Sequence, residues 1–178
     1  MKYKFFLMIL LTGLMLVSQR ISANTDTLIL ENEAGQIVKF ESFLGKKPVY
    51  LKFWATWCKP CMEQMPHFQH AYEQYGDKIQ FVAINIDLND DAHSVAKVKE
   101  RFSLSMPLFT DLTAQVAKHY EFMGTPFHVL IDSDEKVIFQ GGDTMDTPVD
   151  DVQLRDRIAS DNLGLELVPC DELSGFDN

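Results

Sequence analysis

The sequence predicts an α/β fold in which helices flank a central mixed β-sheet. Short runs of β-branched and aromatic residues alternate along the chain with segments whose apolar residues recur every three or four positions. Apolar residues make up 46% of the 178 residues and charged residues 24%, which is ordinary for a globular protein. This length corresponds to a single domain, because domains usually contain about 100–200 residues.

The first predicted elements are a hairpin and a buried strand. Residues 27–30 and 37–40 are rich in β-forming side chains and flank a turn at Gly35, so we expect them to pair. Residues 48–54 (PVYLKFW) hold a single charged side chain among β-forming ones, which is typical of a strand that is covered on both faces.

A helix is predicted after residues 55–61, which follow this third strand directly. Met65, Phe68 and Tyr72 recur at spacings of three and four, as on the apolar face of an amphipathic helix. The helix is expected to span 62–75. Two of the three cysteines therefore lie where a buried strand gives way to a helix.

The alternation of strands and helices continues toward the C-terminus. The prediction comprises a second central strand at 79–87, helices at 90–102 and 112–120, strands at 127–132 and 137–140 around a turn, and a last helix at 148–163. Residues 165–178 are acidic and show no clear period, so they are treated as a tail. The main domain is expected to span residues 24–164.

Residues 1–23 have the layout of a secretory signal peptide. Lys2 and Lys4 precede an apolar run at 5–17, and smaller and more polar residues lead up to Ala23, after which we expect cleavage. The alternative is an uncleaved membrane anchor, but thirteen residues span only about 20 Å of a hydrocarbon core about 30 Å thick. Either way, the body is expected outside the cytoplasm, where disulfides persist.

The charge balance argues against two classes of partner. The whole chain has 16 basic and 26 acidic residues, a net charge of −10. Cleavage after Ala23 removes Lys2, Lys4 and Arg20 and leaves 13 basic against 26 acidic residues, or −13. Such a surface repels phosphate backbones and anionic lipids, so we expect no nucleic-acid partner, and membrane attachment only through an uncleaved anchor.

The chemistry of the chain is expected at Cys58-Lys59-Pro60-Cys61, between a strand and a helix. The first sulfur of such a pair lies at the helix N-terminus, where the partial positive charge of the helix and the neighbouring Lys59 favour a thiolate. The thiolate is the attacking species, so Cys58 is the predicted nucleophile. Cys61 lies one turn into the helix, is expected to be more buried, and would resolve a mixed disulfide.

A structural disulfide and half of a metal site are the alternatives for these two cysteines. Zinc sites usually need four ligands from two such pairs, and the chain contains only one further cysteine, Cys170, about 110 residues away. We therefore expect no metal and no cofactor.

The residues around the cysteines resemble a known superfamily. Residues 53–61 (FWATWCKPC), with Pro66 five positions after the second cysteine, resemble the thioredoxin superfamily, and more narrowly the extracytoplasmic TlpA/ResA-like thiol-disulfide oxidoreductases. Gly124-Thr125-Pro126 before residues 127–132 is similar to the second signature of that family. The resemblance covers roughly residues 28–163 and implies a thioredoxin-like fold with an N-terminal β-hairpin extension.

The resemblance also implies roles for residues around the cysteines. Pro126 would be cis and face the two sulfurs, which leaves the backbone of Thr125 to pair with an extended client segment and keeps metals from the thiols. Trp57 would be an exposed aromatic that helps to dock partners. Lys59 and Pro60 would shape the site, and Pro60 favours a reductant. A trans proline and a core position for Trp57 are the alternatives.

Two positions depart from the family pattern. Thioredoxins carry a buried aspartate where this chain has Lys52, and TlpA/ResA-like reductases often carry a glutamate where it has Gln64. Gln64 cannot take a proton from the resolving thiol. Either Lys52 or a water chain accepts the proton of the Cys61 thiol instead, or Cys61 is activated only in the complex with a client. Alternatively, the Lys52 amine reaches the surface. His128 is expected to pack in the core rather than tune Cys58.

The resulting functional hypothesis is a periplasmic thiol-disulfide oxidoreductase that reduces client proteins. Cys58 attacks the client disulfide and Cys61 resolves the intermediate. By family resemblance, a membrane electron donor of the DsbD type would reset the pair, and apocytochrome c is one possible client.

Three alternative functions stay open. The same pair could instead install disulfides. A thiol peroxidase would require threonine three positions before the reactive cysteine, where this chain has Ala55. A binding module would keep its cysteines inert.

Overall fold

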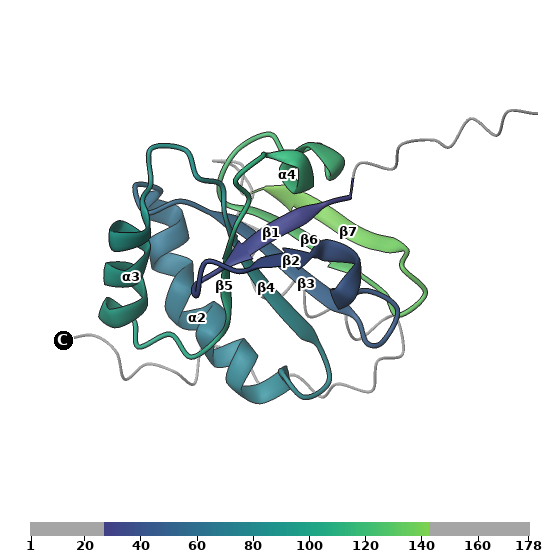
Figure 1. Cartoon of the computed structure of the whole chain (residues 1–178). Helices are drawn as coiled ribbons and strands as arrows, with labels where there is room; N and C mark the ends of the chain where they lie inside the picture. The colour runs from purple at the N-terminus through teal and green to yellow at the C-terminus, as the bar shows by residue number, and fades with distance from the viewer. Residues whose placement is uncertain (1–26, 143–178) are drawn as a thin grey trace, which may run out of the picture.

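The computed structural model describes residues 27–142 (Figure 1). Its sheet has seven strands in the order β2-β1-β5-β4-β3-β6-β7. The strands are β1 (Ile29–Asn32), β2 (Ile37–Lys39), β3 (Val49–Trp54), β4 (Gln80–Asn85), β5 (Leu108–Thr110), β6 (Phe127–Ile131) and β7 (Val137–Gly142). The helices are the 3-10 helix η1 (Phe40–Phe43) and the α-helices α2 (Lys59–Tyr75), α3 (Ala92–Arg101) and α4 (Gln115–His119).

The sheet is mixed, as the sequence predicts. The central strand β3 pairs parallel with β4 and antiparallel with β6, while β4 pairs parallel with β5. The hairpin of β1 and β2 is antiparallel, and β1 joins the main sheet through β5. The predicted thioredoxin-like fold with an N-terminal hairpin is therefore confirmed.

Both faces of the sheet are covered, and this explains the apolar run of β3. Tyr50 and Trp54 belong to a buried cluster with residues of α2 and α3, whereas Leu51 and Phe53 belong to a second cluster with η1 and α4. Successive side chains of a strand point to opposite faces, so a strand between two helical layers needs apolar residues on both. Figure 1 shows α2 and α3 together on one side of the sheet and α4 apart from them.

The observed elements differ from the predicted ones in a few places. Strand β5 was not predicted, because its three residues show no period and it is defined by its pairing with β4 and β1. Helix α4 is shorter than predicted, and α2 begins three residues earlier, at Lys59. Within residues 27–142, no helix is long and apolar enough to span a membrane. The predicted signal peptide, the helix at 148–163, the acidic tail and Cys170 lie outside the described residues.

Candidate active site

The two cysteines lie where β3 ends and α2 begins. Cys58 is the N-cap residue of α2, and its sulfur accepts a hydrogen bond from the backbone N–H of Cys61 at 3.2 Å. The two residues form a disulfide. Cys58 is 4% exposed and Cys61 is fully buried, so Cys58 is the less buried of the two cysteines. Pro60 fits the first turn of the helix, where a backbone N–H has no partner to lose.

The loop before β6 carries a cis peptide bond between Thr125 and Pro126. The sheet register pairs Phe53 of β3 with Phe127 of β6. This pairing places Pro126 beside the end of β3 from which the cysteine loop leaves. The hydroxyl of Thr125 is buried and has no hydrogen-bond partner within residues 27–142.

Trp57 stands beside Cys58 with 53% of its surface exposed. Its indole N–H donates a hydrogen bond of 2.6 Å to the carbonyl of Leu88, in the loop after β4. Leu88 and Met123 are also exposed apolar side chains, at 54% and 87%. Trp54, in contrast, is fully buried in the core on the α2 side.

Lys52 is buried beneath this site and does not reach the surface. The side chain is 1% exposed, so the alternative in which its amine extends to solvent is wrong. Its ammonium donates a hydrogen bond to Oε1 of Gln64 on α2 and lies 5.6 Å from the ring centre of Phe68. The amine cannot reach solvent because α2 covers this face of β3. Gln64 supplies the hydrogen-bond acceptor that a buried cation needs.

A second buried polar pair lies next to Lys52. The β3–β6 register sets Lys52 opposite His128, whose Nδ1 lies 2.9 Å from the hydroxyl of Tyr50. Burial, and then the charge of Lys52, hold the pKa of His128 well below its ordinary value of 6.5. His128 is therefore a neutral residue of the core, as the sequence indicated, although it is hydrogen-bonded rather than simply packed.

Asp90 was not identified as a site residue from the sequence. Its neighbour Asp91 caps α3 by accepting a 2.7 Å hydrogen bond from the N–H of Ser94. The Asp90 carboxylate instead accepts hydrogen bonds from Thr56, beside the cysteines, and from Asn85. No periodicity separates two adjacent aspartates, so sequence reasoning had no signal for this contact.

Comparisons with known proteins agree with this geometry. Residues 22–140 match the AhpC/TSA family. The chain belongs to the AhpC/TSA family. Similar proteins include the thiol-disulfide oxidoreductase ResA of Bacillus thuringiensis subsp. konkukian, 32% identical over 119 residues, which are 66% of this chain and 67% of that protein. ResA of Bacillus anthracis is 30% identical over 122 residues, 68% of this chain and 69% of that protein.

Solved structures show the same fold. A Chlorobium tepidum protein described as a thiol:disulfide interchange protein of the DsbE type is 28% identical, with a TM-score of 0.64 over 75% of this chain and 92% of that chain. A secreted Mycobacterium tuberculosis disulfide oxidoreductase has a TM-score of 0.65 at 19% identity, covering 75% and 96% of the two chains. This AhpC/TSA protein is thus a thiol-disulfide oxidoreductase of the ResA/DsbE type with a Cys58–Cys61 pair.

The stability of this AhpC/TSA protein is expected to fall below about pH 6.5 because of His128. A group whose pKa is lowered on folding contributes stability above its ordinary pKa and loses it as the pH falls toward the folded-state value. For each proton that is taken up only on unfolding, the free energy of unfolding falls by up to about 1.4 kcal/mol per pH unit as the pH is lowered. Urea unfolding from pH 8 to 5 should show this slope, and His128→Asn should flatten it. Parallel curves for the two proteins would contradict the assignment.

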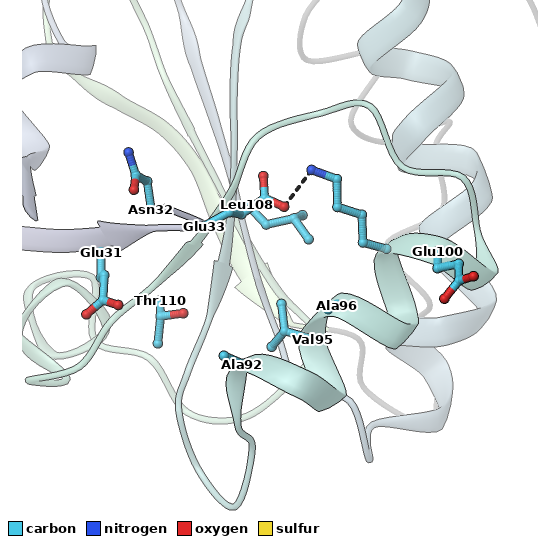
Figure 2. Close-up of a pocket in the computed structure, with 10 residues that line it drawn as sticks. Glu31, Asn32, Glu33, Ala92, Val95, Ala96, Glu100, Leu108 and Thr110 are labelled. Atoms are coloured by element: carbon cyan, nitrogen blue, oxygen red, sulfur yellow. Dashed lines mark hydrogen bonds and ion pairs between the residues drawn. The ribbon is translucent and has the colours of Figure 1, made fainter. Parts of the chain in front are cut away.

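One hollow on the described surface lies away from the cysteines. It has a volume of about 350 Å³ and is bordered by β1, β5 and α3 (Figure 2). Two of the residues that line it, Lys99 and Glu33, form an ion pair of 2.5 Å. Within residues 27–142, no group of three or more metal-ligating side chains comes together.

Proposed function

We propose that this protein reduces disulfides of client proteins in the periplasm. One observation carries the proposal: Cys58 is the N-cap of α2 and the less buried of the two cysteines, with Cys61 fully buried one turn into the helix. A thiolate at that position is stabilised by the helix N-terminus and by the N–H of Cys61. The resemblance to the extracytoplasmic TlpA/ResA-like oxidoreductases supports a location outside the cytoplasm, and so does the predicted signal peptide at residues 1–23.

The reaction is a two-step exchange that moves two electrons to the client. The Cys58 thiolate attacks one sulfur of the client disulfide, the client S–S bond breaks, and the other client sulfur leaves as a thiolate that takes up a proton. The deprotonated sulfur of Cys61 then attacks the sulfur of Cys58. The mixed disulfide breaks, the second client thiol is released, and the Cys58–Cys61 disulfide closes. A membrane electron donor of the DsbD type would return the pair to the dithiol.

Client docking is assigned to the rim of the site. An extended client segment would pair with the backbone of Thr125 beside the cis bond to Pro126, as in strand addition. The exposed ring of Trp57 would cover apolar client side chains, and Lys59 and Pro60 shape the approach to Cys58. Unfolded apocytochrome c is one candidate client, because an unfolded chain supplies such an extended segment.

The hydrogen-bonded pair of buried Lys52 and half-buried Gln64 is assigned to tuning the thiols. Gln64 follows Cys61 by three residues on α2, so the ammonium that it binds lies on the cysteine-bearing face of the helix. A buried cation near a sulfur favours the thiolate. In this chain the pair takes the place of the buried acid described for the family.

The direction of the reaction is tested by the reduction potential. The mature protein would be equilibrated with dithiothreitol or glutathione buffers, starting from the oxidised and from the reduced form. We expect a value of about −220 mV or lower, toward that of thioredoxin, because Pro60 between the cysteines is typical of reductants. A value near about −120 mV, that of a strong oxidant, would overturn reduction and make the protein a disulfide donor.

A further inference from the structure

A single carboxylate joins the loop after β3 to the loop after β4. One oxygen of Asp90 accepts hydrogen bonds from the backbone N–H of Thr56 at 2.8 Å and from the side-chain amide of Asn85 at 2.6 Å. The other oxygen accepts from the hydroxyl of Thr56. Asn85 is 1% exposed, so the donors come from a fixed strand end on one side and from the cysteine loop on the other.

The segment that Asp90 binds is the turn that delivers Cys58 to α2. The backbone N–H of Cys58 donates to the carbonyl of Ala55 at 3.2 Å, which closes a four-residue turn with Thr56 and Trp57 at its centre. Asp90 binds Thr56, and the carbonyl of Leu88 binds the Trp57 indole. Both central residues of the turn are therefore attached to the loop between β4 and α3.

That second loop has a constrained backbone. Asp87 and Asn89 have φ angles of 55° and 58°, in the left-handed region that side chains other than glycine seldom adopt. The N–H of Asp87 donates to Oδ1 of Asn85 at 2.8 Å, and the other end of the same amide binds Asp90. Asn85 and Asp90 thus hold the loop at both ends and set the position of Leu88 between them.

We propose that Asp90 is a positioning residue for thiol-disulfide exchange. It touches neither sulfur, and it acts through Thr56 by holding the turn in the shape that places Cys58 at the N-terminus of α2 and Trp57 beside it. Without the carboxylate, Thr56 loses two hydrogen bonds and Trp57 keeps only its bond to a loop that is itself released. The inference rests on the proposed role of Cys58 as the attacking thiol.

The test compares Asp90→Ala with Asp91→Ala. Both residues are aspartates at the start of α3, but Asp91 caps that helix through Ser94 and contacts no part of the cysteine turn. For Asp90→Ala, we expect kcat/KM for insulin reduction to fall about tenfold, equivalent to about 1.4 kcal/mol. Asp91→Ala should stay within about twofold of the wild type. The rates of disulfide reduction and of dithiol oxidation are both measured. The role of Asp90 is therefore tested even if the protein proves to be an oxidant.

A second readout reports the turn without relying on activity. Iodide quenches the fluorescence of exposed indoles, so it should report Trp57 and not the buried Trp54. Quenching should increase in Asp90→Ala and return toward the wild-type value in Asp90→Asn, whose amide oxygen can still accept from Thr56.

The remaining outcomes also decide the proposal. If Asp90→Ala does not fold, Thr56→Val removes only the hydroxyl hydrogen bond and should show smaller changes of the same sign in rate and quenching. A folded Asp90→Ala variant with wild-type exchange and quenching would overturn the positioning role. Equal losses in Asp90→Ala and Asp91→Ala would overturn it as well, since they would indicate general destabilisation of α3.

Discussion

Serine in place of Cys58 is expected to lower the rate of disulfide reduction by on the order of a thousandfold or more. Cys58 is the less buried of the two cysteines and the N-cap of α2, whereas a serine hydroxyl at that position is not ionised at neutral pH and does not attack disulfides. The measurement is insulin reduction with dithiothreitol as electron donor, followed for the wild type and for Cys58→Ser.

The matched variant Cys61→Ser should fail at a different step. Its Cys58 still attacks, but nothing resolves the mixed disulfide, so a covalent adduct with the client accumulates and is seen on a non-reducing gel. Cys58→Ser should form little or no adduct. An adduct on Cys58→Ser but not on Cys61→Ser would reverse the two roles, and full activity in the double variant would support an inert binding module.

The parts of the fold that the sequence predicts are those set by local patterns. The run at 48–54 marked a strand buried on both faces, and the cysteine pair was correctly placed between that strand and a helix. Strand β5 could not be predicted in this way. Its three residues become a strand because β4 and β1 supply hydrogen-bond partners on either side, and those partners lie more than twenty residues away in the chain.

The same limit applies to the candidate site. The sequence pointed to Lys52 and Gln64 separately, each as a departure from a family position, and the structure shows that they bind each other across the β3–α2 layer. The sequence could not show whether the Lys52 amine reaches solvent, because that depends on which helices cover β3 in the folded protein. Asp90 was missed because its partner Thr56 is 34 residues away and its neighbour Asp91 has the same chemistry.

Methionine in place of Lys52 is expected to make the protein more reducing. The ammonium is buried and bound to Gln64, so its charge is poorly screened and favours thiolates over the disulfide. Its loss should destabilise the thiolate form of the pair and lower the reduction potential by about 30 mV, which is a tenfold change in the exchange equilibrium. The measurements are the potential in glutathione buffers and the exchange rate from pH 6 to 9.

Two further variants separate charge from packing in this prediction. Gln64→Glu keeps the amine and neutralises it with a carboxylate, so it should shift the potential in the same direction as Lys52→Met. Lys59→Met removes a cation next to Cys58 whose side chain is 89% exposed, so water screens it and the shift should be smaller. Exchange rates of Lys52→Met equal to those of the wild type at every pH from 6 to 9 would show that Lys52 does not tune the thiols. The cation would then serve only to satisfy Gln64 within the β3–α2 layer.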